Sequence, residues 1–288
     1  MKPHYFIAPP GKRIRLKDYD PAFTGKFKSE QEASARMRAD CETLSVLQDK
    51  FLAQGTHALL LIFQAMDGAG KDGTIKHVMS GVDPQGCAVT NFKRPAGKEL
   101  KHDYLWRFIK ELPERGKIGI FNRSYYEEVL VSRVHRDRLD EQCLPPDVQK
   151  SKSLWRQRFT QINNFEQYLS ENGIIPVKIF MHLSKEKQRE RLLERTTLVE
   201  KRWKFSLDDL EDRAHWTEYM KAYEDALTHT NTLKAPWHII PADERWFSAL
   251  SVAELIVNKL RALRLRYPQP SDEHRKELEK GRRMLRRE

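Results

Sequence analysis

The chain has 288 residues, 39% of them hydrophobic, and its formal net charge of +11 suits an anionic partner: a nucleic acid, a membrane surface or a phosphate-rich substrate. Its length can bury one sizeable core, no apolar run approaches the roughly 18 residues of a membrane span, and nothing at the N-terminus resembles a signal peptide, so we expect a globular cytoplasmic protein. The three cysteines lack the spacing of a disulfide framework or a zinc site.

The predicted elements begin with a basic arm that contains prolines and a helix over 29–52, which we expect to pack across a sheet. From residue 58 onward, short apolar runs alternate with longer amphipathic segments. The runs predicted as strands are 58–63, 87–92, 117–121, 174–183 and 237–241. The predicted helices are 74–80, 98–112, 125–134, 150–171, 185–195, 207–227 and 248–263. This alternation indicates an α/β fold with a mostly parallel five-stranded sheet, whose ligands bind at the carboxyl ends of the strands.

The segment 59–74, LLLIFQAMDGAGKDGT, has the pattern of a phosphate-binding loop between a strand and a helix. Gly68 and Gly70 let the backbone turn successive N–H groups inward, and Lys71 adds a mobile cation where the helix begins. A tight turn without a ligand is the alternative. The candidate phosphate-binding residues are Gly68, Ala69, Gly70, Lys71, Asp72, Gly73 and Thr74.

Two positions of this loop depart from the standard pattern. Ala65 replaces the first glycine, and Asp72 replaces the hydroxyl residue that binds magnesium. Asp67 and Asp72 place two carboxylates among phosphate-binding groups, where they would repel the ligand unless they hold magnesium or orient an attacking phosphate. The loop therefore does not favour an ordinary ATP-fuelled enzyme.

A polar group follows the predicted strand 117–121. Asn122 lies where P-loop enzymes usually present a carboxylate to the metal, and an amide oxygen can still bind magnesium directly or through a water. Arg123 can neutralise phosphoryl oxygens, and Glu127 lies about one helical turn further on. A surface salt bridge is the alternative for Arg123, but its position at a strand end opposite the loop favours a functional role.

The segment 181–213 has the character of a lid. Arg191 and Arg195 lie four residues apart on one face of a predicted helix. Such segments can close arginines over a transferring phosphoryl group and exclude water. The basic residues of the following loop are Lys201, Arg202 and Lys204, and the aromatic residues that we expect to pack within the hairpin are Trp203, Trp216, Tyr219 and Tyr223. A charged, solvated hairpin is the alternative.

These features predict one domain over residues 1–264. It comprises the arm and helix (1–54), a core (55–195 and 235–264) and the lid (about 196–232). Residues 265–288 form a charged tail, which we expect to be a frayed helix or disordered because it has almost no apolar face.

Taken together, these motifs resemble those of the second family of polyphosphate kinases, the P-loop polyphosphate:nucleotide phosphotransferases. The resembling segments are QAMDGAGKDGTIKHVM, VTNFKRPAGKELKHDYLWR, FNRSYYEEVLVSRV, HLSKEKQRERL, KRWKFSLDDLEDRAHWTEYMKAYEDAL and APWHIIPADERWF. The resemblance implies a P-loop kinase-like, three-layer α/β/α fold with a helical lid. It also implies reversible, in-line transfer of a terminal phosphoryl group between inorganic polyphosphate and AMP or ADP, assisted by Mg²⁺ or Mn²⁺.

The resemblance also implies roles for individual residues. Asp67, Lys71, Arg123 and Glu127 are its candidate catalytic residues, with Asp67 and Asn122 as metal ligands. The further nucleotide-binding candidates are Arg94 and Arg133, and the candidates for polyphosphate and the lid are Lys76, Arg191, Arg195, Lys201, Arg202 and Lys204. Asn122 together with Glu127 resembles the subgroup that accepts both AMP and ADP.

The implied partners are polyphosphate, AMP, ADP and ATP, with guanine nucleotides as further candidates, and a second or further copies of the chain in a dimer or tetramer. No nucleic acid or membrane partner is expected. Two alternatives stay open. An ATP-dependent nucleoside or nucleotide kinase would share the fold, although Asp72 argues against it. A basic nucleic-acid-binding protein with a degenerate loop would explain the charge, but the sequence has no RNP, helix-turn-helix or zinc-finger signature.

Overall fold

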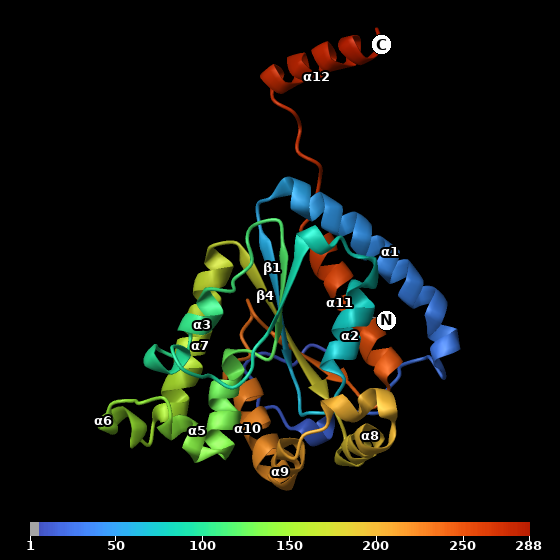
Figure 1. Cartoon of the computed structure of the whole chain (residues 1–288). Coiled ribbons are helices and arrows are strands. Elements are labelled where there is room, and N and C mark those ends of the chain that lie inside the picture. Colours follow the sequence, from blue (N-terminus) through green and yellow to red (C-terminus); the bar gives the residue numbers. More distant parts are fainter. Residues whose placement is uncertain (1–5) are drawn as a thin grey trace.

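The computed structural model describes residues 6–288, so the first five residues of the predicted arm lie outside the described part. A five-stranded sheet lies between two layers of helices (Figure 1). Its strands are β1 (Ala58–Gln64), β2 (Cys87–Asn91), β3 (Ile118–Asn122), β4 (Ile174–His182) and β5 (Trp237–Pro241). Their order is β2-β3-β1-β4-β5, and all four pairings are parallel. The predicted α/β fold is confirmed, and every strand overlaps its predicted range.

The strands follow from the apolar runs because helices cover both faces of the sheet. All residues of β1, β3 and β5 are buried, whereas β2, at the sheet edge, has exposed and half-buried positions. A parallel strand that is buried on both faces is apolar throughout rather than alternating. The central strand β1 therefore delivers the glycine-rich loop to the middle of the carboxyl edge of the sheet.

One face of the sheet is covered by α1 (Glu30–Gln54), α2 (Lys71–Val78) and α11 (Arg245–Ala262) (Figure 1). Helix α1 begins at Ser29, whose hydroxyl accepts a hydrogen bond from the backbone N–H of Glu32, and ends at Gly55 in a left-handed conformation. It packs mainly against α11 and shares the hydrophobic core of that face with residues of β1.

The opposite layer contains α7 (Leu154–Glu171) and α10 (Trp216–His229), together with the short helices α3 (Trp106–Ile109), α4 (Val131–Val134), α5 (Arg136–Asp140) and α6 (Pro146–Gln149) (Figure 1). The 3₁₀ helix η6 (Tyr125–Val129) directly precedes α4. Helix α8 (Lys185–Thr197), the 3₁₀ helix η7 (Val199–Lys204) and α9 (Asp208–Ala214) follow β4 at the carboxyl edge of the sheet.

Three predicted helices are broken in the structure, and 125–134 is divided at Leu130 into η6 and α4. The range 98–112 contains only the 3₁₀ helix η5 (Glu99–Lys101) and α3, because His102 is extended and the Asp103 carboxylate accepts a hydrogen bond from the backbone N–H of Leu105. The range 207–227 is divided at His215 into α9 and α10.

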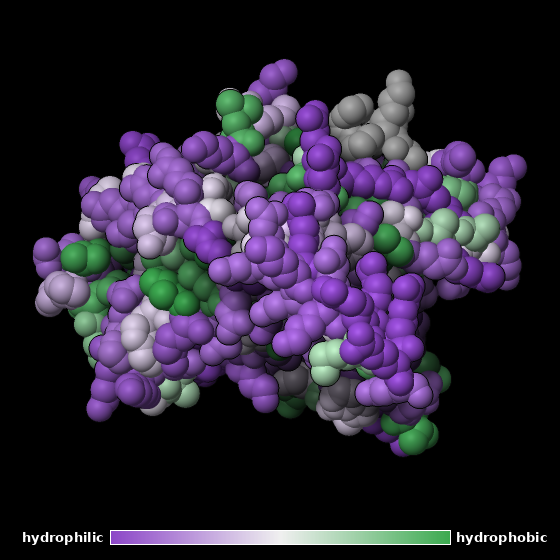
Figure 2. All heavy atoms as spheres, turned by 90° about the horizontal axis from the view of Figure 1, so that it is seen from above, coloured by the Kyte–Doolittle hydropathy of each residue, from purple (hydrophilic) through white to green (hydrophobic). Residues whose placement is uncertain are grey.

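The charged tail forms a helix, α12 (Asp272–Leu285), which projects away from the rest of the chain and has no buried residue (Figure 1). The face of the molecule on this side is mostly hydrophilic, with apolar residues only in small separate groups (Figure 2). Among the helices of residues 6–288, none is long and apolar enough to cross a membrane.

Candidate active site

The glycine-rich loop connects β1 to α2 and closes around its own lysine. Gly68 and Gly70 have φ values of 84° and 97°, which a residue with a side chain rarely adopts. Lys71, the first residue of α2, is buried, and its Nζ donates a hydrogen bond to the carbonyl oxygen of Ala65 at 2.9 Å. The loop thus places a helix N-terminus and a buried cation at one point, an arrangement that binds phosphate.

An ion pair joins this loop to the end of β3. Asp67 Oδ1 accepts a hydrogen bond from Arg123 Nη2 at 3.0 Å and lies 3.9 Å from Lys71 Nζ. Burial alone would raise the pKa of Asp67, but the positive charges of Lys71 and Arg123 outweigh it and lower that pKa below its usual value. Asp67 in turn raises the pKa of Arg123. Both groups are therefore charged at neutral pH.

The backbone around Arg123 is held in an unusual conformation. Its φ of 65° is rare for a residue with a side chain and costs on the order of 1–3 kcal/mol. The backbone N–H of Arg123 donates to the carbonyl of Phe63 in β1 at 3.2 Å. The Ser124 hydroxyl then accepts hydrogen bonds from Gln64 Nε2 and from the backbone N–H of Tyr126, the second residue of η6. Contacts on both sides thus fix the direction of the guanidinium.

Asn122, at the end of β3, fits a magnesium ligand. Its Nδ2 donates to Asp72 Oδ1 at 2.6 Å, while its buried Oδ1 has no hydrogen-bond partner among the described residues. Asp67 and Asp72 line the same cavity as Asn122 and add carboxylate oxygens. Within residues 6–288, no three or more His, Cys, Asp or Glu side chains are grouped to hold a metal by themselves. This oxygen set fits Mg²⁺, which keeps several waters and binds few protein ligands alongside substrate phosphates.

A cavity of about 890 Å³, the basic cavity, opens above the loop. The loop and helix residues that line it are Asp67, Gly68, Gly70, Lys71, Asp72, Gly73 and Thr74, whereas Ala69 is buried beneath. The cations from other elements include Arg123, Lys187, Arg195, Lys201, Lys204 and Arg245. So many cations around one volume are suited to a ligand with many negative charges.

A second cavity of about 320 Å³, the mixed cavity, lies beside the first and is less basic. Its aromatic wall consists of Phe92, Phe108, Tyr219 and Tyr223, and its acidic residues include Glu127, Asp208, Asp209 and Asp212. Burial raises the pKa of Glu127 even though Arg123 and Lys71 act in the opposite direction. Asp67, Phe92, Lys93 and Arg123 line both cavities, so the two volumes meet around the Asp67–Arg123 ion pair.

Arg191 lines the basic cavity but is already fully engaged with the backbone. Its Nη1 donates to the carbonyls of Gly68 and Ala69 at 3.0 and 2.9 Å, and its Nη2 donates to those of Ala242 and Asp243 at 2.8 and 2.7 Å. Burial lowers the pKa of Arg191 to about 10. As placed here, the side chain ties the phosphate-binding loop to the segment that follows β5.

The other predicted lid cations are placed differently. Arg195 donates to Asp209 Oδ2 at 2.5 Å, which connects α8 to α9 beside the basic cavity. Lys201 and Lys204, in η7, line the same cavity. The structure therefore brings these three cations toward the loop.

Three further predicted residues are less closely associated with the site. Arg202 donates to the carbonyl of Thr197, and Lys76 is exposed on α2; neither lines either cavity as residues 6–288 define them. Arg94 lines the mixed cavity and forms an ion pair with Glu141. Its guanidinium would have to leave that carboxylate to contact a phosphate.

Arg133 and the aromatic residues of the hairpin complete the predicted set. Arg133 pairs with Asp225 of α10 at 2.6 Å and lines neither of the two cavities within the described chain. Tyr219 and Tyr223 are buried as predicted. The prediction for Trp203 is wrong: it is 78% exposed, because η7 contributes no buried residue.

Several residues at the site were missed from the sequence. Lys187 and Arg245 line the basic cavity, and Gln188 Nε2 donates to the backbone carbonyl of Asp67 at 2.9 Å. Lys187 lies four residues before Arg191, so helical periodicity could have found it. Arg245 follows the last strand at its carboxyl end, where ligands bind in such sheets.

A glycine-rich loop after the central strand of a parallel sheet, facing an arginine at the next strand end and a helical lid, defines a P-loop kinase-like phosphotransferase. Residues 27–267 match the family model of polyphosphate kinase 2 (PPK2). The chain therefore belongs to the PPK2 family, which confirms the resemblance drawn from the motifs.

Individual relatives agree over almost the whole chain. It is 45% identical to the ADP-polyphosphate phosphotransferase of Rhodopseudomonas palustris, over 99% of each chain. It is 42% identical to the AMP/ADP-polyphosphate phosphotransferase of Meiothermus ruber, over 92% of this chain and 95% of that one. Among solved structures, polyphosphate kinase 2 from Arthrobacter aurescens TC1 superimposes with a TM-score of 0.86 at 36% identity, covering 96% of both chains.

Proposed function

We propose that this protein is a polyphosphate-dependent nucleotide kinase that reversibly transfers the terminal phosphoryl group of inorganic polyphosphate to AMP and ADP. The observation that carries the proposal is the Asp67–Arg123 ion pair at the junction of two cavities of different character. The relatives named above are polyphosphate phosphotransferases for ADP and for AMP and ADP, which supports the same substrates here.

The two substrates are assigned to the cavities by charge. Polyphosphate carries about one negative charge per phosphate and suits the basic cavity, where its attraction should fall with salt. The mixed cavity combines aromatic walls with carboxylates, which disfavour a polyanion but accommodate a base and ribose. The terminal phosphates of donor and acceptor then meet between Asp67 and Arg123.

The reaction requires positioning and charge neutralisation more than covalent chemistry. An oxygen of the acceptor's terminal phosphate bonds to the terminal phosphorus of polyphosphate while the bond to the bridging oxygen breaks, so the polymer becomes one phosphate shorter. Lys71 and Arg123 would neutralise the phosphoryl oxygens, and Asp67 would orient the acceptor. Residues of about 196–232 would close as a lid that excludes water.

A divalent cation would be held by Asn122 Oδ1 and the carboxylates of Asp67 and Asp72, which line the basic cavity. When bound, Mg²⁺ or Mn²⁺ supplies further charge neutralisation at the phosphates.

Product analysis tests the proposal. Purified protein with Mg²⁺ and long-chain polyphosphate, but without ATP, should convert AMP to ADP and ATP, and ADP to ATP. Turnover of ADP alone would support a polyphosphate kinase but exclude AMP as acceptor, in keeping with the name of the R. palustris relative, ADP-polyphosphate phosphotransferase. Activity that requires ATP as donor would instead favour the ATP-dependent nucleotide kinase.

The cytoplasmic location, the dimer or tetramer and the use of guanine nucleotides remain predictions.

The acceptor range and the metal are tested together by Asn122→Asp. The new carboxylate would lie beside that of Asp72, so the concentration of Mg²⁺ needed for half-maximal rate should fall by about three-fold or more. The ratio of AMP to ADP turnover should shift as well. Titrating Mg²⁺ at fixed nucleotide measures both effects. Asn172→Asp, which adds the same charge at an exposed position after α7, is the control. An unchanged ratio and an unchanged metal requirement would contradict the role of Asn122.

Arg195→Ala tests the lid. Removing this guanidinium should raise the KM for polyphosphate by about ten-fold, because it eliminates a charge-assisted contact in the basic cavity and leaves Asp209 without its cation. The KM for the nucleotide should rise by a smaller factor, because Asp209, which loses its cation, lines the mixed cavity. Arg189→Ala, on the exposed side of the same helix, is the matched control. Equal kinetics for both variants would restrict Arg195 to its contact with α9.

A further inference from the structure

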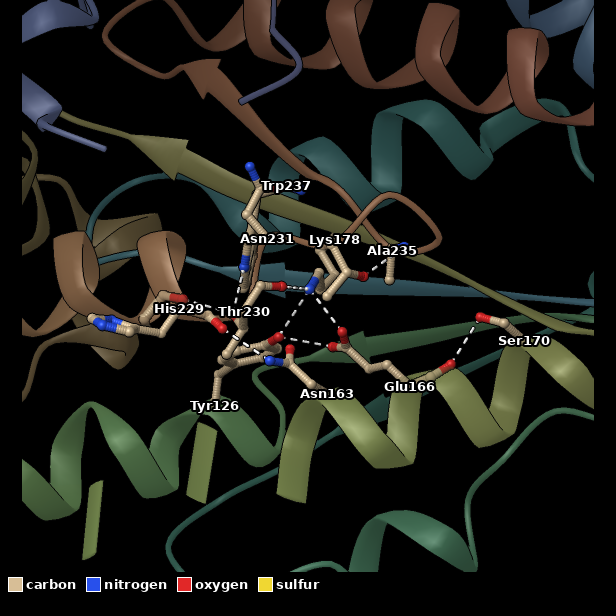
Figure 3. Close-up of polar contacts among 12 residues, drawn as sticks. Tyr126, Asn163, Glu166, Ser170, Lys178, His229, Thr230, Asn231, Ala235 and Trp237 are labelled. Carbon is tan, nitrogen blue, oxygen red and sulfur yellow. Dashed lines mark hydrogen bonds and ion pairs between the residues drawn. The ribbon is translucent and has the colours of Figure 1, made fainter. Parts of the chain in front are cut away.

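A buried lysine–glutamate pair joins β4 to α7 (Figure 3). Lys178, in β4, and Glu166, in α7, have side-chain exposures of 0% and 1%, and Lys178 Nζ lies 2.7 Å from Glu166 Oε2. The same Nζ donates to the Tyr126 hydroxyl oxygen at 3.1 Å and to the Thr230 carbonyl at 2.5 Å. The hydroxyls of Tyr125 and Tyr126 donate to Glu166 Oε1 at 3.0 and 2.8 Å. Figure 3 shows Tyr126, Glu166 and Thr230 converging on the lysine.

Stability alone does not explain this pair. Removing two charges from water costs several kcal/mol per ion, and apolar residues of similar volume often serve a core as well or better. Burial accordingly lowers the pKa of Lys178, although Glu166 acts against the shift. What a buried ionic network adds is a fixed geometry for every group bonded to it.

The bonded groups belong to the two elements that shape the reaction site. Tyr125 and Tyr126 open η6, immediately after Arg123 and Ser124 and immediately before Glu127. Thr230 is the residue that caps the C-terminal end of α10, and its carbonyl accepts a hydrogen bond from Lys178. Helix α10 carries Tyr219 and Tyr223 into the mixed cavity.

We propose that Lys178 and Glu166 are positioning residues for phosphoryl transfer: they hold η6 and the end of α10 against β4, so that Arg123 and Glu127 face the reacting phosphates. This inference rests on the proposed function. Neither residue lines either cavity as described for residues 6–288, so they act through the tyrosines and Thr230.

The connection predicts which kinetic constants depend on the pair. Arg123, Glu127 and the aromatic wall belong to the anchored elements, so loosening the anchor affects the transition state and the nucleotide. The other polyphosphate-facing cations are on α2, α8, η7 and α11 and, with Lys93, after β2; the side chains of Lys178 and Glu166 bond instead to η6, to Thr230 and to each other. A loss of anchoring should therefore lower kcat and raise the nucleotide KM, while the polyphosphate KM stays within about two-fold.

Two variants test this. Tyr126→Phe removes one hydroxyl from the network and keeps the ring and the ion pair. The double variant Lys178→Met with Glu166→Gln neutralises both charges together, which avoids leaving one buried charge alone, and keeps an acceptor for the tyrosines. Val257→Ala, in α11 on the opposite face of the sheet, is the control for lost stability without lost anchoring.

We expect kcat to fall by about five-fold in Tyr126→Phe and by about ten-fold or more in the double variant, at temperatures where both are folded. Amide hydrogen exchange should accelerate in residues 122–130 of both variants and not in Val257→Ala. Kinetics and exchange equal to those of Val257→Ala would overturn the inference; if the double variant does not fold, Tyr126→Phe decides alone. Wild-type protein without polyphosphate-driven turnover would refute the proposed function instead, and the exchange measurement would still test the anchoring.

Discussion

Lys71→Ala should lower kcat for polyphosphate-driven phosphorylation by about 10²–10³-fold or more. Lys71 is the buried cation of the phosphate-binding loop, bonded to the Ala65 carbonyl and 3.9 Å from Asp67. Its removal takes a positive charge from the floor of the basic cavity and leaves Arg123 as the ion-pair partner of Asp67. Initial rates with ADP and long-chain polyphosphate measure the loss.

The control is Lys280→Ala, which removes the same charge from the exposed helix α12. We expect wild-type rates for that variant. If Lys71→Ala kept its turnover, the loop would not be the phosphate site. If wild-type protein retained RNA or DNA but showed no phosphoryl transfer, the nucleic-acid-binding alternative would be favoured.

Asp67→Asn should lower kcat by about 10²-fold, because the amide keeps the shape of the carboxylate but not its charge toward the acceptor and metal. Since Lys71 and Arg123 lower the pKa of Asp67, the carboxylate is already ionised across neutral pH. The amide carries no charge at any pH, so the rate of the variant should stay low relative to wild type throughout pH about 5 to 8, where the wild-type carboxylate is ionised. Rates of the variant across this range check the expectation, and Asp147→Asn on the exposed helix α6 is the control.

The same substitution has a consequence for stability. A carboxylate whose folded-state pKa lies below its unfolded value of about 3.8 stabilises the fold above that pH, and the contribution is lost as pH falls through the folded-state pKa. The difference in Tm between wild type and Asp67→Asn should be largest above pH about 4 and shrink at lower pH. A Tm difference that grows on acidification would contradict the lowered pKa.

The sequence predicts the sheet well because each strand can be recognised from its own residues. Strands covered on both faces must be apolar, so runs such as ALLLIF identify β1 without knowledge of its neighbours. The loop is equally local, because Gly68 and Gly70 mark the positions of positive φ. Helix interruptions are less predictable: Asp103 breaks the 98–112 segment through a side-chain hydrogen bond that amphipathic periodicity does not register.

The site was predictable only in part, because its contacts join distant segments. Asp67 and Arg123 are 56 residues apart, and only their positions at neighbouring strand ends indicate that they meet. Arg191 has the periodicity of a lid cation, yet its partners are four carbonyls that no pattern specifies. Lys178 stands out in the sequence as a charged residue inside an apolar strand run. Its partner Glu166 lies in α7, the helix that precedes β4, and the sequence does not indicate that the two meet.

The junction between the two cavities bears on how the enzyme would consume a long polymer. The volumes share Asp67, Phe92, Lys93 and Arg123, and the rest of each lining differs, so each substrate would occupy a cavity of its own. A shortened polyphosphate chain held by several cations could then slide forward by one unit while product and fresh acceptor exchange beside it. Such an arrangement favours processive shortening of single chains over uniform shortening of the whole pool.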